Sequence, residues 1–188
     1  MLASFGAVKA FEMDPTARQL AHAKSGLEVV PGSLPTPLPF AAEQFDVITA
    51  FDVLEHIEQD VESLSALATR LAPNGRLYVT VPAFAWLWSK HDELHHHCRR
   101  YTRKLLVARL QEAGLRPVQV TYFNTLLFFP IVITRLIKRF VSDDGSDERL
   151  PPQWINRIFE RVFGAESRFI GRLRVPFGVS LLAIAERR

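Results

Sequence analysis

The chain has 188 residues, 48% of them hydrophobic, which is enough for one folded domain with a substantial core and too apolar for a disordered protein. Its single cysteine excludes a framework of internal disulfides and suits a reducing compartment. The net charge of +3 is uneven, because residues 1–98 carry 6 Lys and Arg against 12 Asp and Glu, whereas residues 99–188 carry 17 against 8.

Apolar runs alternate with helical patterns along the chain. Runs ended by Pro, Gly or an acidic residue predict strands over Ala7–Glu12, Leu27–Val30, Phe45–Phe51, Arg76–Val81, Pro117–Phe123 and Val179–Ala185. Apolar residues at helical spacing predict helices over Pro15–Lys24, Ile57–Leu71, Thr102–Ala113 and Gln153–Phe163. We therefore expect one α/β domain over residues 1–188, with a mostly parallel sheet.

Functional residues are expected just after the strands, because α/β sheets bind ligands beyond the carboxyl ends of their strands. Glu12 ends the first predicted strand, where a carboxylate can accept hydrogen bonds from both hydroxyls of a ribose; a surface acid is the alternative. The Pro-rich segment Ser33–Phe40 is stiff enough to cover the face of an adenine, or it is an ordinary connector.

The segment F-D-V-L-E-H follows a predicted strand at Phe45–Phe51. Its spacing would place Asp52 beside Glu55 and His56 on one helix face. The three side chains could hold a divalent ion, act as general acid and base, or put acids at the positive end of a helix.

The segment H-D-E-L-H-H-H-C-R-R-Y-T, residues 91–102, holds four of the six histidines. Three consecutive histidines cannot all point one way, so at most one or two can join a site. Cys98 has no C-x-x-C partner, which argues against structural zinc. Arg99, Arg100 and Tyr101 could clamp a phosphate or carboxylate of the acceptor, or the whole segment is a solvated loop.

A basic, apolar segment extends from Asn124 to Val141. Its apolar run is too short for a membrane span of about 20 residues. A helix with an apolar face and with Arg135, Lys138 and Arg139 opposite could lie on an anionic membrane surface, or it could pack on the sheet. We expect a helical insertion over residues 123–175, before the last strand.

Several blocks together resemble the class I S-adenosylmethionine-dependent methyltransferases. They are F-E-M-D-P, L-P-F-A-A-E-Q-F-D-V-I-T-A-F-D-V-L-E-H-I, L-A-P-N-G-R-L-Y-V-T-V-P-A-F and A-G-L, in the right order over nearly the whole chain. P-A-F-A-W-L-W and H-C-R-R-Y-T are similar to a bacterial subgroup of the type-11 and type-23 methyltransferase domains. The resemblance implies a Rossmann-like doubly wound sheet with an antiparallel last strand. It also implies methyl transfer from S-adenosylmethionine to a small-molecule, lipid-linked or glycan acceptor, which we expect in preference to nucleic acid.

The resemblance also implies roles for single residues. Glu12 takes the ribose position, Met13 and the Ser33–Leu34 pair flank the adenine, and Phe51 and Asp52 line the pocket beside the methionine moiety. Many relatives have Asp where Ser33 stands. The expected general base is His56, with His97 as the second candidate.

The D-x-x-E-H pattern from Asp52 to His56 also resembles the E-x-x-E-H helix start of small-RNA and ubiquinone-pathway O-methyltransferases. There the motif and a distant histidine bind a divalent ion, and the matching set here is Asp52, Glu55, His56 and His97. Because Asp is shorter than the first Glu of that motif, we expect transfer without a metal and keep a divalent ion as the alternative.

The family's first strand and its loop of the form G-x-G-x-G should precede Ala7 and do not occur in the sequence. That strand is central in the family's sheet, and its loop cradles the methionine end of the cofactor. We therefore expect a truncated reading frame, a mis-called start or a fragment, with two strands short of a neighbour and weak cofactor binding. The alternative function is a non-catalytic, membrane-associated binding module. The start lacks the pattern of a signal peptide, so we expect a cytoplasmic protein, either free or at the inner face of the membrane.

Overall fold

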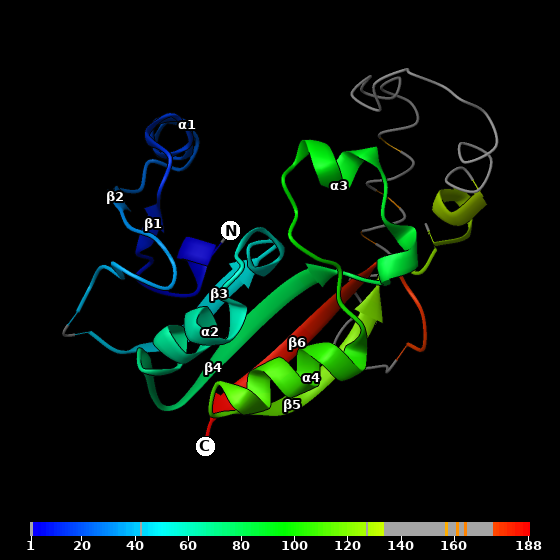
Figure 1. Cartoon of the computed structure of the whole chain (residues 1–188). Helices are drawn as coiled ribbons and strands as arrows, with labels where there is room; N and C mark the ends of the chain where they lie inside the picture. The colour runs from blue at the N-terminus through cyan, green and yellow to red at the C-terminus, as the bar shows by residue number, and fades with distance from the viewer. Residues whose placement is uncertain are drawn as a thin grey trace.

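The computed structural model describes residues 2–41, 43–126, 128–133 and 175–188, together with positions 157, 161 and 164. The strands of these residues form two sheets (Figure 1). The smaller sheet pairs β1 (Ala10–Glu12) in parallel with β2 (Val29–Pro31). The larger sheet has the order β3-β4-β6-β5. Its strands are β3 (Phe45–Phe51), β4 (Leu71–Pro82), β6 (Ser180–Arg187) and β5 (Leu115–Phe123).

The last strand is antiparallel to both of its neighbours. β6 runs between β4 and β5 and against both, whereas β3 and β4 are parallel. The antiparallel last strand implied by the family resemblance is therefore confirmed, and so is the Rossmann-like α/β class.

The helices begin and end where local chemistry favours it. α1 (Pro15–Ser25) packs on the smaller sheet, and the Asp14 side chain caps it by accepting from the Ala17 amide at 2.7 Å. α4 (Arg103–Glu112) is capped by Thr102, as predicted. The Thr102 hydroxyl oxygen accepts from the Leu105 amide at 3.1 Å. The shorter helical elements are η1 (Leu2–Ser4), η2 (Leu54–His56), η3 (Ala85–Leu87) and α3 (Lys90–Leu94).

The core lies between the larger sheet and two helices on one of its faces, α2 (Asp60–Ala68) and α4 (Figure 1). Buried residues alternate with half-buried ones along β4 and β6, which is the pattern of a sheet with one fully covered face. Leu77, Val79 and Leu181 point into this core, where each fully buried side chain contributes roughly 1.5–3 kcal/mol.

The helix predicted over Ile57–Leu71 is shorter than expected. It begins at Asp60 because the preceding residues form the 3-10 turn η2, and it ends at Ala68. The predicted stop, Pro73-Asn74-Gly75, lies within β4 instead. The chain bulges there, since the pairing with β3 jumps from Phe45↔Leu71 to Val47↔Arg76.

A trough of about 490 Å³ separates the two sheets, lined by residues from β1, from β3 and from the segment before β1. Val47, in the middle of β3, is 55% exposed. Within the part of the chain that the structure describes, β1 and β3 each have a single paired neighbour. β1 and β3 are therefore edge strands of their sheets, facing the trough.

The expected helical insertion over residues 123–175 lies mostly outside the described residues, which include a helical segment at 128–133. Among the helices of the described ranges, none is long and apolar enough to cross a membrane.

Candidate active site at the carboxyl ends of β3 and β4

Hydrogen bonds join the turn after β3 to β4. Asp52 has a positive φ of 52°, which is uncommon for a residue other than glycine. Its amide donates to the Thr80 carbonyl at 3.0 Å, and the Thr80 hydroxyl donates to its carboxylate at 3.1 Å. Asp52 thus precedes η2 and shares no helix face with Glu55 and His56, so the predicted helical arrangement of these three residues is wrong.

η2 carries the two residues with the most altered acidity near this turn. Glu55 is only 1% exposed, and its Oε2 atom has no hydrogen-bond partner. Burial raises the pKa of Glu55 to about 7, and the nearby charge of Asp52 acts in the same direction. Desolvation and the neighbouring His97 lower the pKa of His56, so that its neutral form dominates at neutral pH.

The two predicted catalytic histidines come together in space. The rings of His56 and His97 meet edge to face, with centroids 4.7 Å apart. Glu55 completes the group: one potential ligand atom from each of the three residues lies within 4.8 Å of the other two. Residues about 40 positions apart in the sequence therefore form one cluster beside the carboxyl end of β3.

A buried carboxylate, that of Asp92, orients this cluster. Its Oδ1 accepts from Arg100 Nε at 2.7 Å and lies 2.9 Å from His97 Nδ1. Its Oδ2 accepts from the amide of Ser89, completing a capping box at the start of α3. Burial alone would raise the pKa of Asp92, but the hydrogen bond and charge of Arg100 outweigh it and lower this pKa. Asp92 is not among the residues predicted from the sequence, although S-K-H-D at residues 89–92 is a capping-box pattern.

Hydrogen bonds hold the segment from residue 91 to 102 against η2 and against the residues between η2 and α2. The Cys98 amide donates to the Glu55 carbonyl at 2.6 Å. Arg99 donates to the carbonyls of Ile57 and Glu58 at 2.8 and 3.0 Å. These bonds fix His97 relative to His56.

The predicted acceptor clamp of Arg99, Arg100 and Tyr101 is wrong, because their polar groups are engaged within the protein. Tyr101 is fully buried and donates its hydroxyl hydrogen to Asp60 at 3.0 Å. Burial also raises the pKa of Tyr101, so the hydroxyl stays protonated. Arg100 is buried against Asp92, and Arg99 pairs with Asp60 at 3.0 Å. The three side chains hold the loop in place.

An aromatic cluster lies beyond the carboxyl ends of β4 and β5. Phe84 stacks on Tyr122 with centroids 5.1 Å apart, and Phe128 meets the edges or faces of Phe84, Trp86 and Phe177. Trp86 is half-exposed. This cluster is not among the predicted sites, although aromatic residues are dense in F-A-W-L-W and L-L-F-F-P.

The predicted cofactor residues fall into two groups. At the carboxyl end of the smaller sheet, Glu12 accepts from the Asp14 amide at 2.9 Å and Met13 is 71% exposed. The Ser33 hydroxyl donates to the Thr36 carbonyl, so it closes its own loop, and Leu34 packs against the core. The second group, at the carboxyl end of the larger sheet, is Phe51 and Asp52. Strand pairing brings together the members of each group but does not join the two groups.

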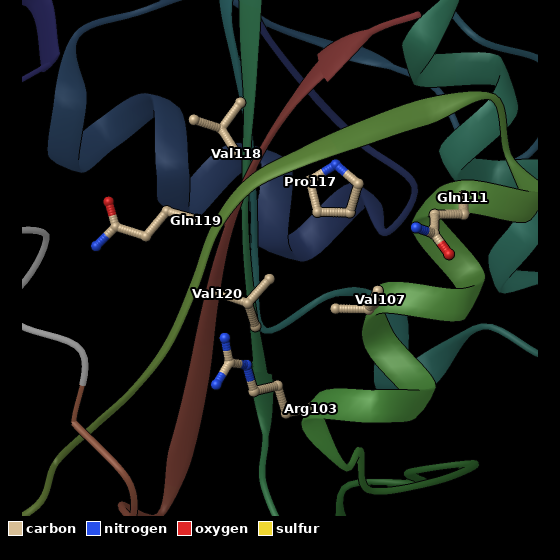
Figure 2. A pocket seen from close by; sticks show the side chains of 7 residues that line it. All are labelled: Arg103, Val107, Gln111, Pro117, Val118, Gln119 and Val120. Carbon is tan, nitrogen blue, oxygen red and sulfur yellow. The ribbon is translucent and has the colours of Figure 1, made fainter.

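A second cavity, of about 240 Å³, lies between α4 and β5 (Figure 2). Val107 and Gln111 line it from the helix, and Pro117 to Val120 line it from the strand. Neither this cavity nor the trough includes His56 or His97 in its lining. The candidate chemistry is therefore at the strand ends and outside both cavities.

Comparisons with known proteins identify the family. Residues 5–120 match a family model described as a methyltransferase domain. Comparison with curated protein sequences finds no match. A protein from Bacillus halodurans assigned as a methyltransferase is similar in structure, with a TM-score of 0.63 at 18% identity, over 98% of this chain and 84% of that one.

Two further solved structures have the same fold. One, from Galdieria sulphuraria and assigned as a sarcosine dimethylglycine methyltransferase, has a TM-score of 0.54 at 16% identity, over 96% of this chain and 69% of that one. LepI, solved in complex with S-adenosylmethionine, has a TM-score of 0.50 at 20% identity, over 63% of this chain and 33% of that one. Because the family match spans more than half of the residues, the chain belongs to the S-adenosylmethionine-dependent class I methyltransferases.

Proposed function

We propose that this chain transfers a methyl group from S-adenosylmethionine to a hydroxyl group of an apolar small-molecule, lipid-linked or glycan acceptor. The observation that carries the proposal is the contact between His56 and His97 after the carboxyl end of β3, and the aromatic cluster that follows β4 and β5 adds a separate apolar surface. An imidazole pair supplies proton transfer and an aromatic surface supplies apolar binding.

S-adenosylmethionine, when bound, supplies an electrophilic methyl group. The chain's own part is to bind and orient the acceptor and to remove its proton. His56, neutral at neutral pH, accepts the proton of the acceptor hydroxyl in the metal-free protein. His97 is anchored through Nδ1 on Asp92, which leaves its Nε2 to contact the same hydroxyl.

The residues proposed to hold the cofactor fit it in part. The Glu12 carboxylate, at the end of β1, is fixed by the Asp14 amide and suits a ribose. Met13 and Phe51 are apolar side chains that remain exposed at strand ends, as expected of surfaces that a ligand covers. Ser33, Leu34 and Asp52 complete the proposed set.

The acceptor is proposed to be apolar and the site to face a membrane surface. Phe129 is exposed and contacts Phe128 and Phe177 of the aromatic cluster, and Leu126 and Ile133 are exposed in the same stretch of sequence. The second half of the sequence is also rich in Lys and Arg, which favours contact with anionic lipid headgroups over a soluble acidic partner. The proposed location is therefore peripheral, at an anionic membrane surface.

The test is transfer of a radioactive methyl group from S-adenosylmethionine into separated extracts of bacterial cells. We expect label in the organic, lipid-containing phase, and at least a tenfold loss in His56→Ala. Label confined to the nucleic-acid or protein fraction would contradict the acceptor class. The control is His22→Ala, which alters a histidine on α1.

One observation favours a second function, a non-catalytic binding module: the trough separates the two sheets, and no strand of the described residues pairs with both. Calorimetric titration with S-adenosylmethionine and, separately, with anionic lipid vesicles separates the two functions. Binding of vesicles without cofactor binding favours the module, and saturable cofactor binding favours the enzyme.

A further inference from the structure

A buried carboxylate lies next to the proposed chemistry. Asp92 is completely buried and contacts His97, whose ring in turn contacts that of His56, the proposed base. We propose that Asp92 is a positioning residue of the methyl transfer. It fixes the tautomer and the ring plane of His97 and, through that ring, the orientation of His56.

Asp92 binds His97 at two points. The His97 amide donates to the Asp92 carbonyl at 2.9 Å, and the ring atom Nδ1 lies 2.9 Å from Asp92 Oδ1. The short loop between the two residues is therefore closed by its backbone and by its side chains. His96, inside this loop, has a positive φ of 54°, which turns the chain back. The His97 side chain is only 10% exposed, so its ring has little room to rotate.

The Asp92 carboxylate determines which ring nitrogen of His97 carries the hydrogen. Its Oδ1 accepts from Arg100 Nε at 2.7 Å, and its Oδ2 accepts from the Ser89 amide at 2.8 Å. Because both oxygens already accept from N–H donors, the carboxylate has no hydrogen to donate, and His97 Nδ1 is the donor of their contact. Neutral His97 therefore carries its hydrogen on Nδ1 and its lone pair on Nε2.

Asp92 is itself fixed to the larger sheet through Arg100. This buried arginine donates to Asp92 through Nε, and through Nη1 it donates at 3.1 Å to the carbonyl of Ala83, which directly follows β4. The capping box with Ser89 holds the other carboxylate oxygen at the start of α3. Contacts within the protein thus set the orientation of His97 relative to the end of β4 before any ligand binds.

The ring of His97 passes this order on to His56. The two rings are nearly perpendicular, at 85°, and their centroids are 4.7 Å apart. Aromatic rings attract each other when an edge meets a face, so rotation of either ring weakens the contact. The Cys98 amide donates to the Glu55 carbonyl at 2.6 Å and holds the two backbones at this separation. A base whose ring plane is already fixed needs less ordering when the acceptor binds.

The inference rests on the proposed function and specifies how its proton transfer is oriented. His56 accepts the proton of the acceptor hydroxyl, whose oxygen donates an electron pair to the methyl carbon. The C–S bond breaks, and its electron pair stays on the sulfur. Asp92 takes no part in these bonds. Its effect is that the rings of His97 and His56 keep one orientation during the transfer.

The tautomer is measured by long-range proton–nitrogen NMR on the full chain, labelled at the histidine rings and free of S-adenosylmethionine, with His97→Gln to identify the signals. We expect the hydrogen of neutral His97 on Nδ1. The double variant Asp92→Ala, Arg100→Met removes both buried charges together, so that neither is left without its partner. There we expect the hydrogen on Nε2, the position that a solvated histidine favours. Hydrogen on Nε2 in the unchanged chain, or on Nδ1 in a folded double variant, would overturn the proposal.

The role in transfer is measured with radioactive methyl groups over a range of S-adenosylmethionine concentrations. In the double variant we expect the maximal rate to fall at least tenfold and the KM for S-adenosylmethionine to change less than twofold, because orientation of the base is lost and cofactor binding is not. A changed tautomer with an unchanged maximal rate would overturn the role of Asp92 in transfer and leave the proposed function intact.

The matched control is Tyr101→Phe, which weakens the same loop at a different carboxylate. The buried Tyr101 hydroxyl donates to Asp60 and to the Leu54 carbonyl, and its loss leaves the contact between Asp92 and His97 in place. We expect this variant to keep the tautomer and the maximal rate. An equal loss of rate in Tyr101→Phe would show that Asp92 acts only through stability and would overturn the proposal. Absence of transfer by the unchanged chain contradicts the proposed function, whereas an unexpected tautomer contradicts only the present inference.

Discussion

The carboxylate of Asp92 joins neighbours from three parts of the chain. It receives hydrogen bonds from the Ser89 amide and from Arg100, and it lies against His97. Because both Asp92 and Arg100 are buried, neither charge has water as a substitute partner. One residue thus links the start of α3, the loop and the candidate site.

Replacing Asp92 with Asn should lower the free energy of unfolding by about 3–5 kcal/mol, because it leaves the buried guanidinium of Arg100 without its counter-charge. Urea denaturation followed by circular dichroism measures the change. Glu93→Gln, an exposed neighbour on α3, should change stability by less than about 0.5 kcal/mol. Equal losses of stability in the two variants would contradict the role of Asp92 as the counter-charge of the buried Arg100.

The acidity of Glu55 predicts an unusual pH dependence. Its pKa of about 7 in the folded chain exceeds the unfolded value of 4.5, so the folded state holds the extra proton between these values. This stabilisation is complete below pH 4.5 and is lost as the pH rises through 7. In EDTA, we expect stability to fall from pH 5 to pH 7.5 by on the order of 2–3 kcal/mol more than in Glu55→Gln. If the stability of the two proteins changed with pH in parallel, the raised pKa of Glu55 would be contradicted.

At the scale of elements, the loop before α4 is held through Arg99. Its guanidinium reaches two carbonyls after η2 and the carboxylate of Asp60 at the start of α2. A planar group with several donors can serve three acceptors at once, and an ammonium group cannot reproduce that arrangement. The position of His97 therefore depends on an arginine that touches neither histidine ring in the described contacts.

Arg99→Lys should lower stability by about 1–2 kcal/mol and loosen the loop. Hydrogen exchange should become faster at the Cys98 amide, which donates to the Glu55 carbonyl. Arg103→Lys, on an exposed part of α4, is the comparison. Unchanged exchange at Cys98 in Arg99→Lys would show that other contacts hold the loop.

Much of the fold was predictable, because the strands carry apolar runs and the helices carry caps. β3 has the predicted bounds, and Thr102 and Gly114 bracket α4 as expected. The 3-10 turn η2 was not predictable from spacing alone, because D-V-L-E-H also fits a helix. Tyr101 and Arg99, which are distant in the sequence, bind the Asp60 carboxylate at the start of α2, and spacing does not reveal such contacts.

The candidate site was predicted in part. The structure brings His56 and His97 together, and their catalytic roles stay predictions, whereas Arg99, Arg100 and Tyr101 bind groups of the protein itself. A basic or hydroxyl side chain looks the same in sequence whether it faces a ligand or a buried carboxylate of its own chain. Here Asp60 and Asp92 are those carboxylates, and only the tertiary structure reveals their burial.

At the scale of the whole molecule, the trough leaves β3 with an open edge. Val47 and Phe51 are exposed along it. The opposite edge of the sheet, β5, is better protected, because it contains Pro117 and a register shift between Pro117 and Gln119. Open apolar edges favour pairing between molecules.

Val47→Lys should therefore reduce self-association, since a charge on an edge strand opposes edge-to-edge pairing. Sedimentation velocity over a concentration series measures the effect. Val118→Lys, on the protected edge, should change it little. If both substitutions act alike, net charge and not the β3 edge governs association.

The place of β6 in the sheet has a consequence for the order in which the chain can fold. β4 and β5 are joined in the sheet only through β6, yet β5 ends at Phe123 and β6 begins at Ser180. During synthesis, β3 and β4 can pair early, but the other edge of β4 stays unpaired until β6 has been made. Strand pairs between segments that are far apart in the sequence form slowly, and an unpaired strand edge can meanwhile pair with other chains. A growing chain of this protein thus passes through a half-built sheet, and chaperones or slow translation would act during that interval.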